Sequence, residues 1–415
     1  MKELNTDLLI IGAGPAGLAA ALKAHEEGLQ DIVVVDRDES PGGILQQCIH
    51  DGFGLQRFKR RLSGTQYAQR YIDALAETGC RLFLNTSVLE ITPEKTVYAC
   101  SSDGIMRFNC GAIILAMGCR ERTAMQAFIY GSRPAGVMTA GAVQRCINIK
   151  GWIPGKRAVI LGSGDIGLIM ARRMTLEGIE VEGIYEQADY VGGNRRNLKQ
   201  CAADFGVPLH LSSTVTRVHG KQRLEAVTTV KLDKDKKPIA GTERKVECDL
   251  LVLSVGLIPE NELSAGLGLE FDPGTGGPRV DENFMTSLNG VFAAGNAVAV
   301  MDLADYVSYT GELAAAGAAR YLRGELELDT VPADVAFSEN IRFVVPQRIR
   351  SANHNELPLF MRVCSPEANV ELKVTSSGSV ISEQALKYVT PPEMLTYVLP
   401  AGEHTDIEIS VVPQR

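Results

Sequence analysis

The stretch that most constrains the fold lies near the N-terminus, where an apolar run leads directly into a glycine motif. Residues 7–18 read DLLIIGAGPAGL, a pattern that predicts a buried strand, the turn G-x-G-x-x-G and the start of a helix. Gly12 permits the tight turn, Gly14 lets the backbone approach a pyrophosphate, and Gly17 lets the helix pack closely on the strand. The phosphates accept hydrogen bonds from the N–H groups at the start of the helix. The stretch therefore predicts a dinucleotide site.

An acidic residue at the end of the next strand supports this prediction. Residues 32–35 are IVVV, and Asp36 follows them, 24 positions after Gly12. A carboxylate at this place accepts hydrogen bonds from the hydroxyls of the adenosine ribose. The alternative is a solvated carboxylate at a strand end, but the ordered strand, glycines, helix, strand and acid favour the ribose role.

The whole pattern occurs a second time, 150 residues further along the chain. Residues 158–161 (AVIL) lead into Gly162, Gly164 and Gly167, a helical stretch follows, and the strand at 181–186 ends at Glu186. Glu186 again lies 24 positions after the first glycine of its motif. The repeat predicts a second dinucleotide site, with Glu186 in the place of Asp36.

Length and charge narrow the class of protein. A chain of 415 residues is long enough for two or three domains. The formal net charge of −8 argues against nucleic acid or an anionic membrane as the main partner. The apolar run at 8–22 is too short to span a bilayer, so we expect no integral membrane segment. The N-terminus lacks a secretory layout, and we expect a cytoplasmic protein.

Nine cysteines are spread along the chain without a C-x-x-C pair. This spacing favours reduced thiols over a secreted disulfide framework, and it offers neither an iron–sulfur ligand run nor a metal motif. From residue 330 onward glycine turns become sparse and Ser/Thr/Val segments alternate. The stretches 370–374 and 405–412 predict antiparallel strands, and hence a small β-rich domain.

Three further segments extend the likeness to a known group of proteins. The motifs at 115–118 (LAMG), 253–259 (LSVGLIP) and 291–296 (VFAAGN), with the two glycine turns, resemble the pyridine nucleotide–disulfide oxidoreductase superfamily over residues 6–325. The resemblance implies an α/β fold with two Rossmann-like domains and a small β-rich C-terminal domain. It implies an FAD-binding domain formed by residues 1–118 and 270–329. An NAD(P)-binding domain is inserted at 119–269, and the β-rich domain covers 330–415.

The same resemblance implies which residues hold the two cofactors, FAD and NAD(H). The residues expected to line FAD are Gly12, Gly14, Pro15, Ala16, Asp36, Arg37, Gly42, Gly43, Val88, Ala116, Met117, Gly118, Gly295 and Asn296. Those expected to line the nicotinamide dinucleotide are Gly162, Gly164, Asp165, Ile166, Glu186 and Gly256.

Two departures from the superfamily pattern matter. Asn296 stands where the superfamily usually has Asp beside the flavin ribityl chain, which implies altered contacts rather than a lost cofactor. The redox-active cysteine pair is also missing, because Cys48 stands alone after the Gly42-Gly43 turn and Cys146 stands alone before the second glycine turn. Thiol–disulfide exchange needs a partner sulfur, so we expect no dithiol relay.

A narrower resemblance comes from residues 42–50 (GGILQQCIH), 118–122 (GCRER), 133–137 (RPAGV) and 254–261 (SVGLIPEN). These segments are similar to the FAD/NAD subunits of opine oxidases and hydrogen cyanide synthase, and to a flavoprotein that accompanies bacterial anaerobic glycerol-3-phosphate dehydrogenase. The opine-oxidase branch carries a cysteine-rich cluster segment in its C-terminal domain. Only Cys364 lies in this tail, so such a cluster would belong to another protein.

Single residues near the predicted flavin allow two interpretations. Cys48 and His50 are the candidates for stabilising reduced flavin or passing a proton, although a buried thiol and a hydrogen-bonded histidine are the favoured interpretation. Cys119 is interpreted as structural. Arg120 and Arg122 cover a phosphate or form surface ion pairs.

Together these features predict an FAD-dependent oxidoreductase that exchanges a hydride with NAD(H) without a redox-active disulfide. A reduced flavin needs an outlet for its electrons, so we expect a small-molecule substrate or acceptor and a partner redox subunit. The tail from residue 330 is the candidate docking surface, with structural support of the FAD domain as its alternative. One alternative function is the flavoprotein subunit of an amine, opine or hydroxy-acid dehydrogenase. Another is a cofactor-bound sensor or assembly subunit without turnover.

Overall fold

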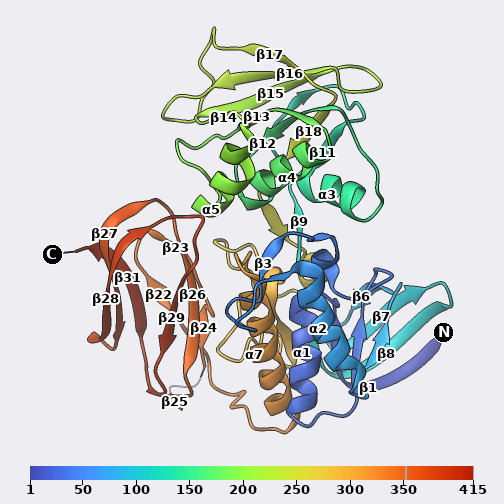
Figure 1. The fold of residues 1–415 in the computed structure, drawn as a ribbon. Coiled ribbons are helices and arrows are strands. Elements are labelled where there is room, and N and C mark those ends of the chain that lie inside the picture. The colour runs from blue at the N-terminus through green and yellow to red at the C-terminus, as the bar shows by residue number, and fades with distance from the viewer. Residues whose placement is uncertain (351–352, 415) are drawn as a thin grey trace. The chain divides into compact units, whose positions relative to one another are not determined.

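The computed structural model describes residues 1–350 and 353–414, and Figure 1 shows the fold. The chain forms two compact units, Met1–Cys119 with Pro259–Arg415, and Arg120–Ile258. The first unit is therefore discontinuous in sequence, with the second inserted into it. The α/β fold class is confirmed, with two Rossmann-like sheets and a β-rich C-terminal segment. The predicted division into three domains stays a prediction.

The first unit is built on a seven-stranded sheet whose central strands are parallel and buried on both faces. Leu8, Leu9 and Ile10 of its central strand are fully buried, as expected where helices cover both faces of a parallel sheet. The strands run in the spatial order β5 (Arg81–Phe83), β2 (Ile32–Val35), β1 (Lys2–Ile11), β8 (Gly104–Leu115), β7 (Thr96–Ser101) and β6 (Ser87–Ile91), and β20 (Val291–Ala293) pairs with β8.

Two predicted strands of this unit have different bounds in the structure. The sequence pattern of residues 81–91 predicts one strand, but these residues form two strands, β5 and β6, because the extended run is interrupted near Asn85, whose φ is 48°. The apolar run that starts at residue 111 predicts a strand from there, but the strand, β8, begins at Gly104. The long β8 pairs antiparallel with β7 and continues in parallel beside β1. Strand β8 is thus both an arm of the hairpin with β7 and a core strand beside β1. Its two parts therefore carry different sequence patterns.

Three helices cover this sheet: α1 (Pro15–Glu26), α2 (Gly64–Ala76) and α7 (Ala304–Leu322). Helices α1 and α7 lie side by side (Figure 1). Their backbones approach closely, since a Cβ added to Gly311 would lie 2.2 Å from the carbonyl oxygen of Ala16. The Ala/Gly-rich sequence predicts a helix from about residue 311, but helix α7 begins at Ala304, seven residues earlier. Its first turns carry polar and aromatic residues that hide the apolar helical pattern.

The second unit contains a five-stranded parallel sheet and a four-stranded sheet. The parallel sheet has the order β11 (Val137–Thr139), β18 (Leu250–Leu253), β12 (Arg157–Leu161), β13 (Glu180–Tyr185) and β14 (Leu209–His210), with helices α3 (Ala140–Asn148) and α4 (Asp165–Leu176). The other sheet has the order β10 (Tyr130–Gly131), β15 (Ser213–His219), β16 (Ala226–Lys231) and β17 (Arg244–Glu247). Two short strands lie where the chain passes from one unit into the other, β9 (Cys119–Glu121) and β19 (Leu257–Pro259).

The C-terminal segment is β-rich, as predicted. One sheet has the order β22 (Ala336–Phe337), β31 (Ile407–Pro413), β27 (Glu367–Ser376) and β28 (Ser379–Val389), and another has β23 (Ile341–Val345), β26 (Leu357–Val363) and β29 (Leu395–Leu399). Strands β27 and β31 are antiparallel, which confirms the pairing predicted for 370–374 and 405–412. Phe360 of β26 packs edge-on against Tyr306 of α7, with ring centroids 5.4 Å apart.

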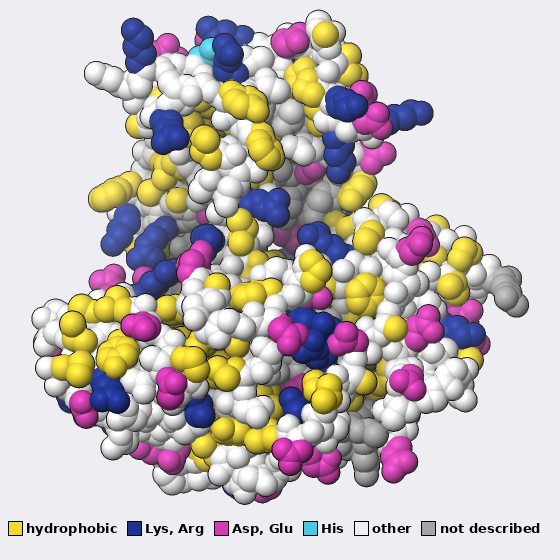
Figure 2. Space-filling view, turned by 180° about the vertical axis from the view of Figure 1, so that it is seen from behind, with side chains coloured by type: hydrophobic (Ala, Val, Ile, Leu, Met, Phe, Trp, Pro, Cys, Tyr) yellow, Lys and Arg dark blue, Asp and Glu magenta, His cyan; other side chains and the backbone are white. Residues whose placement is uncertain are grey.

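The surface is mixed in charge. On the face drawn in Figure 2, Lys and Arg side chains are interspersed with Asp and Glu side chains. In the part of the chain that the structure describes, no helix is both long enough and apolar enough to cross a membrane.

Candidate functional site

The first glycine turn follows β1 and has the geometry of a phosphate cradle. A Cβ on Gly12, whose φ is 106°, would lie 2.3 Å from the carbonyl oxygen of Ala116, and one on Gly17 would lie 1.8 Å from that of Gly12. These two glycines allow backbone segments to touch. Gly14 differs from both, because a Cβ there would meet no heavy atom within 4 Å. The open space at Gly14, next to the start of α1, fits the pyrophosphate of FAD.

Asp36 lies at the end of β2 and faces this turn. One of its carboxylate oxygens accepts from the N–H of Ala13 at 2.6 Å, and the other accepts from the N–H of Asp38 at 2.8 Å. The carboxylate is therefore fixed against the glycine turn, where the ribose of a bound adenosine is expected. Its ribose contact stays a prediction. Arg37, the next residue, is exposed.

The other residues predicted to line FAD surround the same end of the sheet. The Gly42-Gly43 segment contacts the first turn, since the N–H of Gly42 donates to the carbonyl of Ala13 at 2.7 Å. Three parallel strands, β1, β8 and β20, end here, and ligands of such sheets bind beyond the carboxyl ends of the strands. The residues that follow β8 and β20 are Ala116, Met117, Gly118, Gly295 and Asn296. Pro15 and Ala16 begin α1, and Val88 lies on β6.

The Asn296 side chain forms two hydrogen bonds, one as an acceptor and one as a donor. Its Oδ1 accepts from the N–H of Met301 at 2.9 Å, and its Nδ2 donates to the sulfur of Cys119 at 3.5 Å. An aspartate in this place accepts from Met301 but has no donor for the sulfur. The Asn296 amide therefore connects the segment after β20 to Cys119, which follows Gly118 at the end of β8.

Cys48 and His50 follow the Gly42-Gly43 segment. The Cys48 side chain is 7% exposed, and its thiol donates to the carbonyl of Ile44 at 3.3 Å. Burial raises the pKa of this thiol to about 12. The thiol is therefore protonated at neutral pH and is a poor nucleophile, which supports its interpretation as a buried structural residue. The His50 ring is half-buried and tilted against Phe53, with centroids 5.2 Å apart.

The second glycine turn, between β12 and α4, repeats the geometry of the first. A Cβ on Gly162, whose φ is 100°, would lie 2.0 Å from the carbonyl oxygen of Ser254. A Cβ on Gly164 would lie 3.8 Å from its nearest neighbour, the hydroxyl of Ser254, so this glycine also faces open space. Asp165 and Ile166 form the first turn of α4. The turn thus fits a second dinucleotide pyrophosphate at the start of a helix.

Glu186 lies at the end of β13 and contacts this second turn as Asp36 contacts the first. One carboxylate oxygen accepts from both the N–H and the hydroxyl of Ser163, at 2.8 and 2.7 Å, and the other accepts from the N–H of Ala188 at 2.9 Å. Gly256, with a φ of 99°, lies just beyond β18, and its carbonyl accepts from the N–H of Arg122 at 3.0 Å.

Ser163 is a site residue that the motif alone does not predict. The second position of G-x-G is variable, and Ala13 occupies it in the first turn. The Ser163 hydroxyl also accepts from the N–H of Gly192 at 2.8 Å, so it joins Glu186 to the segment that follows β13. A spacing signal for that segment does exist in the sequence, since Gly192-Gly193 lies 150 residues after Gly42-Gly43.

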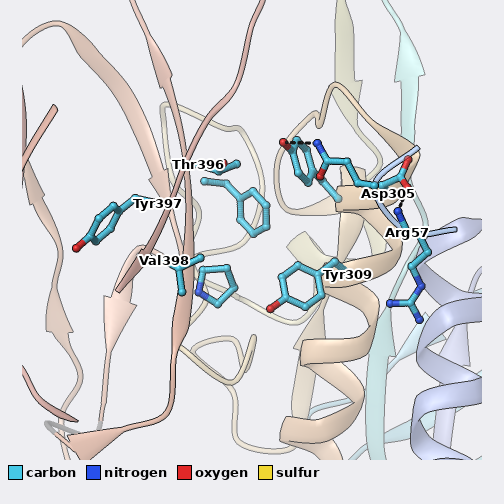
Figure 3. A pocket seen from close by; sticks show the side chains of 10 residues that line it. Arg57, Asp305, Tyr309, Thr396, Tyr397 and Val398 are labelled. Carbon is cyan, nitrogen blue, oxygen red and sulfur yellow. Dashed lines mark hydrogen bonds between the residues drawn. The ribbon is translucent and has the colours of Figure 1, made fainter. Parts of the chain in front are cut away.

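A pocket of about 360 Å³ lies between α7 and strands β26 and β29 of the first unit. Figure 3 shows Tyr309 from one side and Val398 from the other lining it, whereas the Arg57 guanidinium points away. That guanidinium forms an ion pair with Glu312, and the Asp305 carboxylate accepts from the N–H of Arg57 at 2.7 Å and from that of Gly54. The two charged side chains of the pocket, Arg57 and Asp305, are thus both bound to other groups of the protein.

No disulfide joins any two cysteines of the described residues. All nine are present as thiols. Within residues 1–350 and 353–414, no group of three or more His, Cys, Asp or Glu side chains is placed to hold a metal ion.

Replacing single cysteines is therefore expected to leave reduction of the flavin by NADH intact. Cys48→Ser, Cys119→Ser and Cys146→Ser, each made alone, are expected to retain FAD and to lose their visible flavin absorbance when NADH is added without oxygen. The physical reason is that no thiol pair takes part, and that the Cys48 thiol is protonated at neutral pH. If one variant keeps its FAD but no longer bleaches, a thiol mechanism replaces this account.

Two glycine turns of this kind, each with an acidic residue at the end of the next strand, define the class of two-dinucleotide-binding flavoproteins. The family model of the pyridine nucleotide-disulphide oxidoreductases matches residues 6–318, and the chain belongs to this family. It is an FAD-dependent pyridine nucleotide oxidoreductase, and its cofactors are FAD and NAD(P)H.

The chain is similar to several curated proteins. It is 26% identical to an opine oxidase subunit of Rhizobium meliloti over 70% of this chain and 66% of that protein. It is 27% identical to the hydrogen cyanide synthase subunit HcnB of Pseudomonas aeruginosa over 64% of this chain and 60% of that protein. The matches thus span less than two thirds of these relatives. Among solved structures, thioredoxin reductase of T. acidophilum has the same fold, with a TM-score of 0.61 and 20% identity over 76% of this chain and 98% of that one.

Proposed function

We propose that this chain is the flavoprotein component of a multi-component redox enzyme, that it exchanges a hydride between FAD and NAD(H), and that it uses no redox-active disulfide. The observation that carries the proposal is the pair of matching glycine turns, each open at its central glycine and each held by a strand-end carboxylate. Bound FAD and nicotinamide supply the hydride chemistry, because transfer between their rings needs no protein nucleophile.

The residues of the chain then bind and orient the two cofactors. Gly14 and the N–H groups that open α1 receive the FAD pyrophosphate, and Asp36 receives the adenosine ribose. Gly164 and Glu186 do the same for the nicotinamide dinucleotide. Asn296 is held by Met301 and Cys119 at the edge where the ribityl chain is expected.

A partner protein is the favoured outlet for the electrons. The chain offers no dithiol to carry them onward, and two of the similar proteins are named as subunits, of opine oxidase and of hydrogen cyanide synthase. These names also favour a second candidate, in which the flavin accepts electrons from the oxidation of an amine or opine. The ring contact between Tyr306 and Phe360 supports a structural role for the C-terminal segment. The outer strands of that segment are the part that is left for docking a partner.

Electron transfer is expected to depend on a partner. When the chain is co-expressed with the products of its neighbouring genes, we expect substrate-to-acceptor turnover that the isolated chain lacks. The measurement is the steady-state rate of the co-purified complex and of the isolated chain, each saturated with FAD. Fast turnover of a physiological substrate by the isolated chain, unchanged by any neighbour, would exclude the partner.

A further inference from the structure

The 150-residue repeat extends beyond the two glycine turns. Gly42 and Gly43 follow Asp36 by six and seven positions, and Gly192 and Gly193 follow Glu186 by the same spacing. In the first unit this pair contacts the phosphate turn, since a Cβ on Gly43 would lie 3.0 Å from the Cα of Gly14. A shared spacing at the equivalent place predicts a shared contact in the second unit.

The second pair makes this contact. The N–H of Gly192 donates to the Ser163 hydroxyl at 2.8 Å, and a Cβ on Gly193 would lie 2.9 Å from a carboxylate oxygen of Asp165. That oxygen also accepts from the backbone N–H of Asn194 at 3.0 Å and from the side-chain amide of Asn197 at 2.7 Å. Three hydrogen bonds therefore fix residues 192–197 against the start of α4.

The backbone conformation at Gly192 does not by itself require a glycine. Its φ lies outside the left-handed region, and a Cβ there would lie 3.5 Å from the N of Gly164, 3.6 Å from the Ser163 hydroxyl and 3.7 Å from a Glu186 oxygen. These are ordinary contact distances, so alanine fits the protein. The added methyl group would stand directly beside the Gly164 amide, in the open space where a phosphate oxygen accepts from this turn.

We propose that residues 192–197 form a clamp for the pyrophosphate of the nicotinamide dinucleotide, in which Gly192 leaves a phosphate oxygen free to reach the Gly164 amide. The inference rests on the proposed NAD(H) site and adds a second wall to it. The first wall is the glycine turn at the start of α4, and the second is the clamp. A dinucleotide enclosed from both sides leaves only when the contacts to Asp165 and Ser163 open.

The test is the affinity of Gly192→Ala for NADH and for ADP-ribose, which keeps the pyrophosphate but lacks nicotinamide. Isothermal titration is expected to give a dissociation constant raised roughly ten- to a hundredfold for both, equivalent to about 1.4–2.8 kcal/mol, the range of a charge-assisted hydrogen bond. Adenosine, which has no phosphate, is expected to bind the variant and the wild type alike. Gly266→Ala is the matched control, since a Cβ there also meets no clash.

A second variant tests the clamp without touching the phosphate space. Asn197→Ala removes one hydrogen bond to Asp165, and it is expected to speed NADH dissociation in stopped-flow displacement, whereas Lys199→Ala, an exposed neighbour, is not. FAD content and melting temperature are expected to stay at wild-type values in all four variants. Unchanged ADP-ribose affinity in Gly192→Ala would overturn the clamp alone. A wild type that binds neither NADH nor ADP-ribose would overturn the NAD(H) site itself.

Discussion

Gly14→Val is expected to abolish FAD binding and to leave the fold intact. Gly14 has a φ of −73° and a ψ of −172°, an extended conformation that valine adopts readily, and no protein atom lies within 4 Å of its added Cβ. The side chain would instead fill the space of the pyrophosphate. Losing two or three charge-assisted hydrogen bonds costs roughly 4 kcal/mol or more, which is about a thousandfold in affinity. The measurements are FAD released per chain and the melting temperature without cofactor.

Two controls separate a blocked cofactor from a damaged fold. Gly79→Val adds the same side chain in the same unit, at a position where the added Cβ also meets no atom within 4 Å, and it is expected to retain FAD. Gly12→Val is expected to lower the melting temperature, because its Cβ would clash with the carbonyl of Ala116. If Gly14→Val still binds FAD like the wild type, the flavin does not lie on this turn.

A preference for NADH over NADPH of roughly ten- to a thousandfold is expected, because a carboxylate at Glu186 would face the 2′-phosphate of NADP. Such like-charge contacts cost several kcal/mol, at ~1.4 kcal/mol per tenfold. Glu186→Ala is expected to narrow the preference. That variant also loses the acceptor for Ser163, so Glu186→Gln, which keeps an acceptor and removes the charge, is the sharper test.

The readout is the rate of anaerobic flavin reduction by each nucleotide. Glu243→Ala, which removes an exposed charge elsewhere in the second unit, is the matched control and is expected to keep the wild-type preference. Equal reduction of the wild type by NADH and NADPH would show that Glu186 does not contact the ribose.

The parts of this site that the sequence predicts are those in which neighbours along the chain are also neighbours in space. Each glycine turn, at Gly12 or Gly162, lies in one βαβ unit together with the helix that follows it and its strand-end acid, so short-range spacing is sufficient to predict it. The long β8 and the early start of α7 depend on pairing with distant segments. Local pattern alone therefore places their ends wrongly.

Contacts between side chains are the other part that spacing does not reveal. The Asn296–Cys119 hydrogen bond joins residues 177 positions apart, and it gives the amide a partner that the sequence leaves unidentified. The burial that raises the pKa of Cys48 likewise depends on the packing of the Gly42-Gly43 segment against α2. By contrast, the sequence does reveal the Gly192-Gly193 pair, because the 150-residue repeat continues beyond Glu186 and places this pair opposite Gly42-Gly43.

The central claim is that this chain joins bound FAD to NAD(H) without a thiol pair, and anaerobic titration of the purified protein with NADH tests it most directly. We expect the visible flavin absorbance to disappear in proportion to added NADH in the wild type and in a variant lacking Cys48, Cys119 and Cys146 together. A flavin spectrum that NADH leaves unchanged, or that bleaches only when the cysteines are present, would contradict the account.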